Sequence, residues 1–344
     1  MEWESGKLGT ISSNCFIYQK GAAMERERKN DDARRVRRGR GDDKRAARAR
    51  RAQDHTEEMG ARYAKEIEAS VQGVRRIEGA ASACSENPEH AGEGRPVCTV
   101  NVIDADAVSA VLAHGRGRAQ FCDMSVLDCA SFTHPGGGFD RGAWGQEETL
   151  CADSFLFDVL ASQADWYAEN RRRNINCNLF RNRALMVPRV RFSREKVHAY
   201  ADVIVAAAPQ AERAISEYGV GRDVLERAMR DRIRFILGIA DELGHEKLVL
   251  SAFGCGVPGW QASDVAEMMR EELALAPHAA REVYLAVPHT RFNDDHERFL
   301  HAFAAFPERN DESYEQVKAA RAAAAQAAAE SEEDEVEDDW RKYL

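Results

Sequence analysis

The chain has 344 residues, 44% of them hydrophobic and 31% charged, which is enough for one large domain or two modest ones with a sizeable core. No stretch approaches the roughly 18 apolar residues that a membrane helix needs, and no N-terminal apolar run resembles a secretory signal, so we expect neither a membrane protein nor an exported one. The eight cysteines form no CxxC pair and several lie in apolar runs, a pattern typical of reduced thiols in a cytoplasmic protein.

Charge is distributed unevenly along the chain, whose formal net charge is −10. Residues 25–52 hold thirteen Lys and Arg against six acids, whereas eight of the ten residues from Glu330 to Asp339 are acidic. Blocks of like charge are usually solvated tails or helix faces, although a basic block also suits contact with a polyanion. We predict that residues 1–43 form a poorly ordered basic segment, and we keep polyanion contact through residues 25–52 as a second prediction.

Hydrophobic periodicity divides the rest of the chain. Apolar residues at three- and four-residue spacing predict a helical N-terminal extension over 44–80, followed by a loop over 80–96. In residues 97–310, short β-branched runs alternate with amphipathic stretches, which predicts the core domain. Residues 311–344 are predicted to form a helix from Tyr314 to Ala329 followed by the acidic tail. The predicted strands are Cys98–Ile103, Asp123–Ala130, Asp202–Ala207, Lys247–Phe253 and Glu282–Val287. The predicted helices are Gln146–Leu160, Ala214–Leu243, Ser263–Leu275 and Asp294–Phe306.

Apolar strands separated by helices predict an α/β domain with a largely parallel sheet covered on both faces. In such sheets ligands bind beyond the carboxyl ends of the strands, so the segments that follow the strands are the place to look for chemistry. The segment after the second strand carries three glycines, Gly136–Gly138, and nine residues after the last of them Glu147 and Glu148 open a helix. Bare backbone in such a turn suits phosphate binding, and the helix N-terminus favours the two carboxylates. The glycine run alone would most often be a turn, and the two glutamates alone would most often be ordinary acids at a helix N-terminus. Together they predict a functional site.

A second glycine-rich segment, Gly254 to Gly259, reads G-x-G-x-x-G between a strand and a helix. The acid that would hold a nicotinamide ribose is expected at the end of the next strand, which instead ends Val287-Pro288-His289. We therefore interpret this segment as a second phosphate loop, and keep a nicotinamide-dependent oxidoreductase as a minor alternative.

Three further strand ends carry weaker signals. Asp104 follows the first strand, where a carboxylate would accept a hydrogen bond from an adenine amino group, although Asp104 and Asp106 fit a helix cap equally well. Pro209 ends the third strand in a turn. His134 and His289 have no partner ligands at metal-binding spacing, so we predict no metal site.

The glycine run followed by Gln146-Glu147-Glu148 resembles the signature of microbial-type poly(ADP-ribose) glycohydrolases (PARGs), and the resemblance covers roughly residues 98–306. It implies a macrodomain-like mixed sheet sandwiched between helices, with the helical extension in front. It also implies hydrolysis of the ribose–ribose O-glycosidic bond of poly(ADP-ribose) without a cofactor. In this resemblance Glu148 is the catalytic residue and Glu147 contacts the substrate ribose. The substrate-binding residues that follow from the resemblance and the motifs are Asp104, Pro135, Gly136, Gly137, Gly138, Phe139, Gln146, Pro209, Gly254, Cys255, Gly256, Val257, Pro258 and Gly259.

The residues are suited to this chemistry. Cleavage needs a protonated acid near the leaving oxygen, and mutual repulsion of adjacent carboxylates raises the pKa of one of them. We expect Glu148 to protonate the leaving group and then to deprotonate water, while the substrate diphosphate stabilises the cationic ribose. His134, Asp128, Gln210 and Trp260 depart from the family pattern and affect fine substrate contacts. The alternative function is an ADP-ribose-binding macrodomain module or a mono-ADP-ribosyl hydrolase with weak or no polymer activity.

Overall fold

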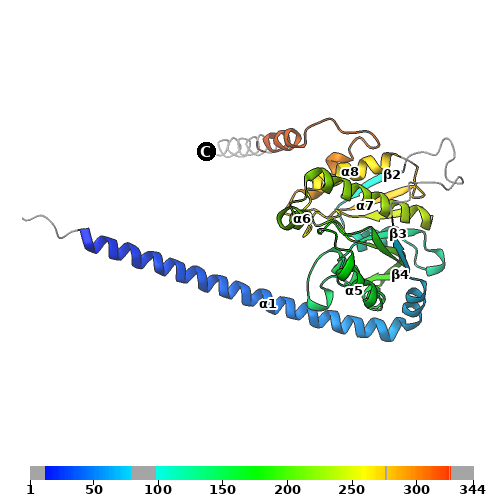
Figure 1. Cartoon of the computed structure of the whole chain (residues 1–344), viewed down its shortest axis with the longest axis horizontal. Helices are drawn as coiled ribbons and strands as arrows, with labels where there is room; N and C mark the ends of the chain where they lie inside the picture. The colour runs from blue at the N-terminus through cyan, green and yellow to red at the C-terminus, as the bar shows by residue number, and fades with distance from the viewer. Residues whose placement is uncertain (1–11, 80–97, 276, 325, 327–344) are drawn as a thin grey trace, which may run out of the picture.

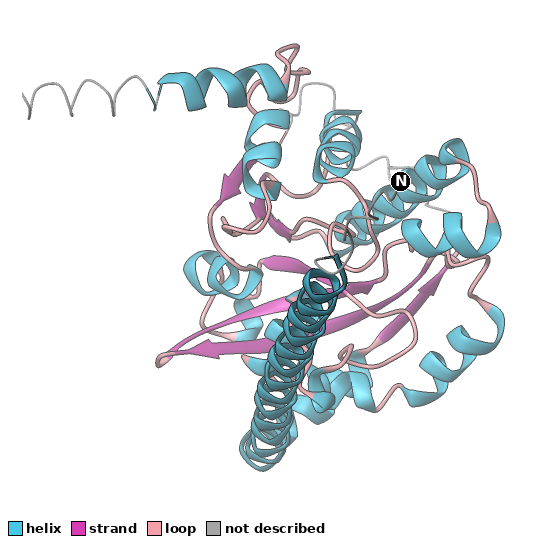
Figure 2. Ribbon diagram, turned by 90° about the vertical axis from the view of Figure 1, so that its left-hand side faces the viewer, coloured by secondary structure: helices cyan, strands magenta, loops and turns pink. Residues whose placement is uncertain are grey.

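The computed structural model describes residues 12–79, 98–275, 277–324 and 326, and it contains a seven-stranded mixed sheet between layers of helices (Figures 1 and 2). Strands β5, β3, β6, β7 and β2 are mutually parallel, and β4 and β1 extend one edge in antiparallel fashion. The order across the sheet is β1-β4-β5-β3-β6-β7-β2. The strands are β1 Arg75–Glu78, β2 Thr99–Ile103, β3 Met124–Cys129, β4 Arg183–Arg194, β5 Val197–Ala206, β6 Lys247–Leu250 and β7 Glu282–Ala286.

The five parallel strands are the five that the sequence predicts, and the α/β class is confirmed. The antiparallel strands β1 and β4 were missed. Strand β4 carries several arginines and Pro188, and its pairing with β5 is interrupted between Val187 and Val190. Proline and an irregular register remove the alternation by which a strand is recognised in a sequence.

Side chains of the strands alternate between two cores, one on each face of the sheet. Val126, Val203 and Val249 point toward one group of helices, whereas their neighbours Leu127, Ile204 and Leu248 point toward the other. The first core is completed by α1 Ser12–Gly73, α2 Ala107–His114, α3 Gln146–Ala152, α4 Leu156–Ala161 and α5 Ala164–Arg173. The second is completed by α6 Ala211–Tyr218, α7 Arg222–Leu243, α8 Ala262–Leu275 and α9 Asp295–Ala302.

Two predicted helices are each divided in two. The predicted helix Gln146–Leu160 is interrupted at Ser154, whose hydroxyl donates to the Leu150 carbonyl and accepts from the Leu156 amide. This side chain thus satisfies backbone groups at the end of α3 and the start of α4. The predicted helix Ala214–Leu243 is interrupted at Gly219, which ends α6 in a left-handed conformation. Helix α5 was not predicted.

Helix α1 begins at Ser12, and the poor order of residues 1–43 stays a prediction. These residues contain no proline and many Ala, Arg, Lys and Glu, which favour a helix. The helix bends at Tyr63, and Figure 1 shows its first half extending away from the α/β body. Residues 1–11, the predicted loop 80–96 and the acidic block lie outside the described residues, whereas residues 314–324 form part of the predicted C-terminal helix. Within the described part of the chain no helix has the length and apolar character needed to cross a membrane.

Candidate active site

A cavity of about 1000 Å³ lies at the carboxyl ends of the parallel strands. The segment after β3 and the segment after β6, which carry the two glycine motifs, both line this cavity. The predicted site residues that line the cavity are Gly137, Gly138, Gln146, Glu147, Glu148, Gly254, Gly256, Val257 and Pro258. Those that lie beside or behind its wall are Asp104, Pro135, Gly136, Phe139, Pro209, Cys255 and Gly259.

Gln146 fixes the start of α3 against the end of β3. Its amide nitrogen donates to the Leu127 carbonyl at 2.7 Å, and its amide oxygen accepts from the Cys129 N–H at 2.8 Å. The side chain thus continues the backbone hydrogen bonding of the strand, and it places the first turn of the helix at the cavity. Gln146 therefore positions the two carboxylates that follow it.

The two adjacent carboxylates have different surroundings. Glu147 is only 5% exposed; its Oε2 accepts from the Ser131 N–H at 2.7 Å, and its Oε1 is buried with no hydrogen-bond partner among the described residues. Glu148 is half-buried, and its Oε1 accepts from the Gly138 N–H at 2.9 Å. Of the two, Glu148 has the more accessible carboxylate.

Gly137 leaves the space that both carboxylates occupy. Its φ is +62°, and a Cβ at this position would lie 2.6 Å from Glu148 Oε1 and 2.7 Å from Glu147 Oε2. Any other residue would therefore be strained and would collide with both acids. The sequence predicted bare backbone for a ligand, whereas at this glycine the carboxylates of the protein itself occupy the space.

A third carboxyl group lies in the layer beneath. Asp128 in β3 is fully buried, and neither of its oxygens has a hydrogen-bond partner among the described residues. Burial, followed by repulsion from Glu148, raises its pKa well above the usual range. Burial, followed by repulsion from Asp128, likewise raises the pKa of Glu147. The expected repulsion between Glu147 and Glu148 is thus a smaller cause than burial and Asp128.

Helix α1 holds the first glycine segment from outside. The Arg48 side chain donates to the Gly142 carbonyl at 2.8 Å, and the Arg45 side chain donates to the Arg141 carbonyl at 3.0 Å. Gly142 has φ of +70°, and a Cβ there would lie 2.0 Å from the Arg45 carbonyl oxygen. The N-terminal helix is therefore part of the support of the cavity wall.

The second glycine segment is anchored by Trp260. Its indole is 8% exposed and donates to the Pro209 carbonyl at 2.8 Å. Pro209 is buried and its carbonyl accepts this hydrogen bond, so Pro209 lies behind the cavity wall and does not line the cavity. Trp260, which departs from the family pattern, is a packing residue of the loop.

The aspartates after β2 have structural partners. Asp106 is the N-cap of α2, with its carboxylate accepting from the Ser109 N–H at 2.7 Å, so the cap interpretation holds for this residue. Asp104 accepts from the backbone N–H of His289 at 2.6 Å. Its predicted contact with adenine stays a prediction.

Several cavity residues were not predicted from the sequence. Trp144 is 74% exposed at the cavity, and Phe132 and Phe180 stack on each other with centroids 4.4 Å apart. Arg141 lines the cavity, and its guanidinium donates to the Gly137 carbonyl at 2.8 Å. Phe180 is 48 residues beyond Phe132 in the chain, so no local pattern connects them; the position of Trp144 within the first motif was the only available signal.

Comparison with known proteins agrees with this geometry. The family model described as the microbial-type PARG catalytic domain matches residues 44–195. A search of curated proteins found no match. Among solved structures, the PARG of Thermomonospora curvata bound to the inhibitor ADP-HPD is 26% identical, with a TM-score of 0.61, and the match covers 75% of this chain and 100% of that one. The PARG of Deinococcus radiodurans in complex with ADP-ribose is 28% identical, with a TM-score of 0.59 and coverage of 68% and 95%.

The chain combines an α/β fold with a cavity that is lined by carboxylates and by two glycine-rich segments. The family match and the two structures confirm the resemblance to microbial-type PARGs and support a glycosidase similar to these enzymes.

Proposed function

We propose that the protein hydrolyses the ribose–ribose O-glycosidic bond of poly(ADP-ribose) and releases ADP-ribose. The observation that carries this proposal is the Glu148 carboxylate, which lines a cavity between two glycine segments and is oriented by the Gly138 N–H at 2.9 Å. The likeness to a PARG solved with ADP-ribose supports the choice of substrate. A macrodomain-type core and a cytoplasmic location stay predictions.

Glu148 acts as the acid and then as the base. In its protonated form it donates to the leaving ribose oxygen as the bond at the anomeric carbon breaks, and the resulting carboxylate then takes a proton from the attacking water. The Gly138 N–H holds one oxygen, Oε1, so the other, Oε2, is the atom that exchanges the proton. Glu147, whose pKa is raised by burial, hydrogen-bonds a ribose hydroxyl and orients the sugar.

The two glycine segments bind the diphosphate from opposite walls. Gly254, Gly256 and Val257 present backbone on one side, facing Gly137 and Gly138 on the other. Arg141 and Arg213 also line the cavity and supply positive charge for the phosphates. The bound diphosphate in turn stabilises the positive charge that develops on the reacting ribose.

The proposal is tested by incubating the protein with labelled poly(ADP-ribose) and, separately, with mono-ADP-ribosylated protein. We expect release of ADP-ribose from the polymer, and a loss of roughly 10³-fold in Glu148→Gln with ADP-ribose binding retained, because the amide keeps its acceptor for Gly138 but has no acidic proton. Glu58→Gln, at an exposed carboxylate on α1, is the matched control.

Each other outcome identifies an alternative. ADP-ribose binding without release from either substrate would indicate a binding module, and release from the mono-ADP-ribosylated protein alone would indicate a mono-ADP-ribosyl hydrolase. Full activity in Glu148→Gln would refute the assignment of the acid. Hydride transfer to a nicotinamide cofactor would revive the oxidoreductase alternative.

We also propose that the basic segment, residues 25–52, contacts the polymer. The body of the protein is acidic, so it repels a polyanion, and the segment has the opposite charge. Arg45 and Arg48 support this proposal, because they join α1 to the cavity wall at Arg141 and Gly142 and so place the C-terminal end of the basic segment beside the cavity.

Replacement of Arg34, Arg35, Arg37 and Arg38 by Gln tests this contact and leaves the α1 contacts at Arg45 and Arg48 in place. We expect weaker polymer binding and a smaller dependence of log K on log salt, with binding of free ADP-ribose unchanged. The control is replacement of four exposed arginines that do not line the cavity, Arg222, Arg227, Arg281 and Arg309. An unchanged salt slope would remove the proposed contact.

A further inference from the structure

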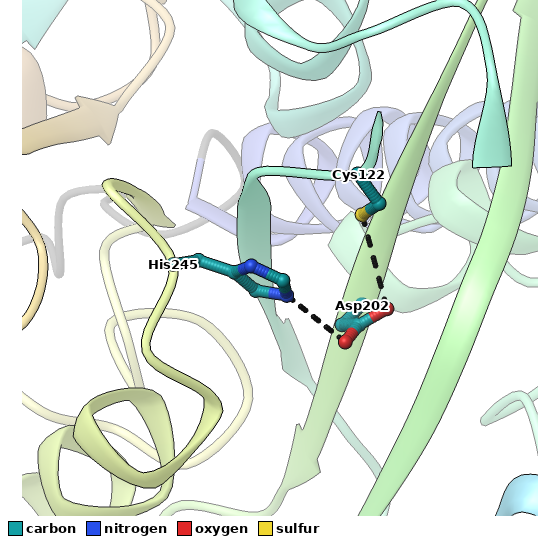
Figure 3. Close-up of side chains that lie close together, drawn as sticks. All are labelled: Cys122, Asp202 and His245. Atoms are coloured by element: carbon teal, nitrogen blue, oxygen red, sulfur yellow. Dashed lines mark hydrogen bonds and ion pairs between the residues drawn. The ribbon is translucent and has the colours of Figure 1, made fainter. Parts of the chain in front are cut away.

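Three side chains with metal-binding atoms meet at the amino ends of the parallel strands, at the edge of the sheet opposite the cavity. Cys122 precedes β3, Asp202 lies in β5 and His245 precedes β6, and their side chains point toward one another (Figure 3). Asp202 Oδ1 lies 3.8 Å from the Cys122 sulfur, and Asp202 Oδ2 lies 3.0 Å from His245 Nε2. The three donor atoms all lie within 4.8 Å of one another.

We propose that Cys122, Asp202 and His245 bind one Zn²⁺ ion, with a water molecule as the fourth ligand. Tetrahedral zinc with ligands at about 2.0–2.3 Å separates neighbouring ligand atoms by roughly 3.3–3.8 Å. The two pairs that involve Asp202, at 3.0 and 3.8 Å, are already close to this spacing, and donor atoms as far apart as 4.8 Å would have to approach by about 1 Å. A thiolate and an imidazole beside one carboxylate favour zinc, because Mg²⁺ and Ca²⁺ prefer oxygen ligands alone.

The charges of this cluster balance when zinc is bound. Thiolate and carboxylate together supply two negative charges against the 2+ ion, and the imidazole is neutral. Formation of the Zn–S bond releases the thiol proton of Cys122 to solvent.

Neighbouring groups hold the proposed ligands in place. The Arg189 N–H donates to Asp202 Oδ1 at 2.7 Å, which fixes the carboxylate and leaves Oδ2 directed at His245. Asp123, next to Cys122, is paired with Lys247 at 3.1 Å and with Arg116 at 3.0 Å, so its charge is already compensated. The ion would connect the starts of β3 and β6 to the middle of β5 and stabilise this edge of the sheet.

Titration of the metal-free full-length protein with Co²⁺, followed by Zn²⁺, tests the proposal. We expect one Co²⁺ per chain, with the visible bands of tetrahedral cobalt and a thiolate-to-cobalt charge-transfer band, both of which zinc displaces. Cys122→Ser should remove the charge-transfer band, and His245→Gln should weaken binding by more than about 100-fold, since even loss of a group behind a metal ligand costs 10–100-fold. Cys177→Ser, at an exposed thiol, is the matched control.

A measurement on the unmodified protein covers the case in which the variants do not fold. Bound zinc should protect Cys122 from alkylation, with the modified peptide quantified by mass spectrometry, and should raise the melting temperature in proportion to free zinc. Substoichiometric cobalt, an unchanged spectrum in Cys122→Ser or equal alkylation with and without zinc would overturn the proposal and leave a purely structural polar cluster. None of these measurements uses ADP-ribose, so their outcome is independent of the proposed hydrolysis.

Discussion

The two glycine segments of the cavity resemble each other in sequence, yet glycine is required for different reasons in each. In the first segment the space beside Gly137 is filled by Glu147 and Glu148, and the space beside Gly142 is filled by the backbone of α1. In the second segment a Cβ on Gly256 would meet no described atom within 4 Å, and the neighbouring Val257 is 87% exposed. The first segment is constrained by the protein at both glycines, whereas the second is open to a ligand at Gly256 and Val257.

This difference indicates that the two glycine segments have different roles in the cavity. The first segment orients the acid, because its backbone N–H groups and its lack of side chains fix the carboxylates. The second offers accessible backbone, which suits close approach of a diphosphate. Substitutions in the first segment should therefore reduce turnover and stability, and substitution of Gly256 in the second should change substrate affinity alone.

Gly137→Ala should have the largest effect. The new Cβ would lie 2.6 Å from Glu148 Oε1, so the carboxylate has to move, and displacement of a reacting group by about 1 Å costs roughly 10²-fold in rate. We expect kcat for polymer hydrolysis to fall by at least this factor. Gly219→Ala is the matched control, because Gly219 has nearly the same φ, +63°, and no described atom within 4 Å. Equal loss in both variants would mean that backbone strain, and not the carboxylates, is responsible.

Gly142→Ala should have the next largest effect. Its Cβ would lie 2.0 Å from the Arg45 carbonyl and 2.8 Å from the Ala49 nitrogen, so α1 has to move away from the cavity wall. We expect a loss of about 3 kcal/mol in the free energy of unfolding, measured in urea, and faster hydrogen exchange in α1 near Ala49. Unchanged exchange there would show that α1 does not support the wall.

Asp128→Asn tests the buried acids behind the first segment. The pKa of the Asp128 carboxyl is raised in the folded state. Such a group stabilises the folded protein fully below the unfolded pKa of about 4, and this stabilisation is lost as the pH rises toward the folded pKa. The loss is about 1.4 kcal/mol per pH unit for each group. The variant removes one such group, so its free energy of unfolding should fall less steeply above pH 4 and exceed that of the wild type at pH 7, by roughly 1–2 kcal/mol. Asp140→Asn, at an exposed acid of the same loop, should leave the slope unchanged.

The contrast between the segments also shows what the sequence could and could not predict. The parallel strands and both loops were predicted because buried runs such as Met124–Cys129 and the glycines after them are local patterns. Strand β4 was missed, since arginines and Pro188 hide its alternation. The role of Gly137 was predicted only in part, because the sequence indicates freedom of the backbone but not which atoms fill the space.

Contacts between segments that are distant in the chain could not be predicted from local sequence patterns. Arg48 reaches Gly142 across 94 residues, and Cys122 approaches Asp202 across 80. Neither pair has a characteristic spacing, so the support of the wall by α1 and the proposed zinc ligands emerge only when the sheet brings the segments together. The carboxylates were easier to find, because Gln146, Glu147 and Glu148 are consecutive and begin a helix.

Gly256→Ala should have the smallest effect and tests the second segment most directly. Without substrate the methyl group has room, so the free energy of unfolding should stay within about 0.5 kcal/mol of the wild type. With substrate the same methyl group stands where the diphosphate approaches the backbone, so KM should rise by roughly 3–10-fold while kcat is unchanged, because the contact is equal in the ground and transition states. A fall in kcat with constant KM would assign this loop to the reacting ribose instead, and an unchanged KM would mean that the diphosphate binds elsewhere along the cavity.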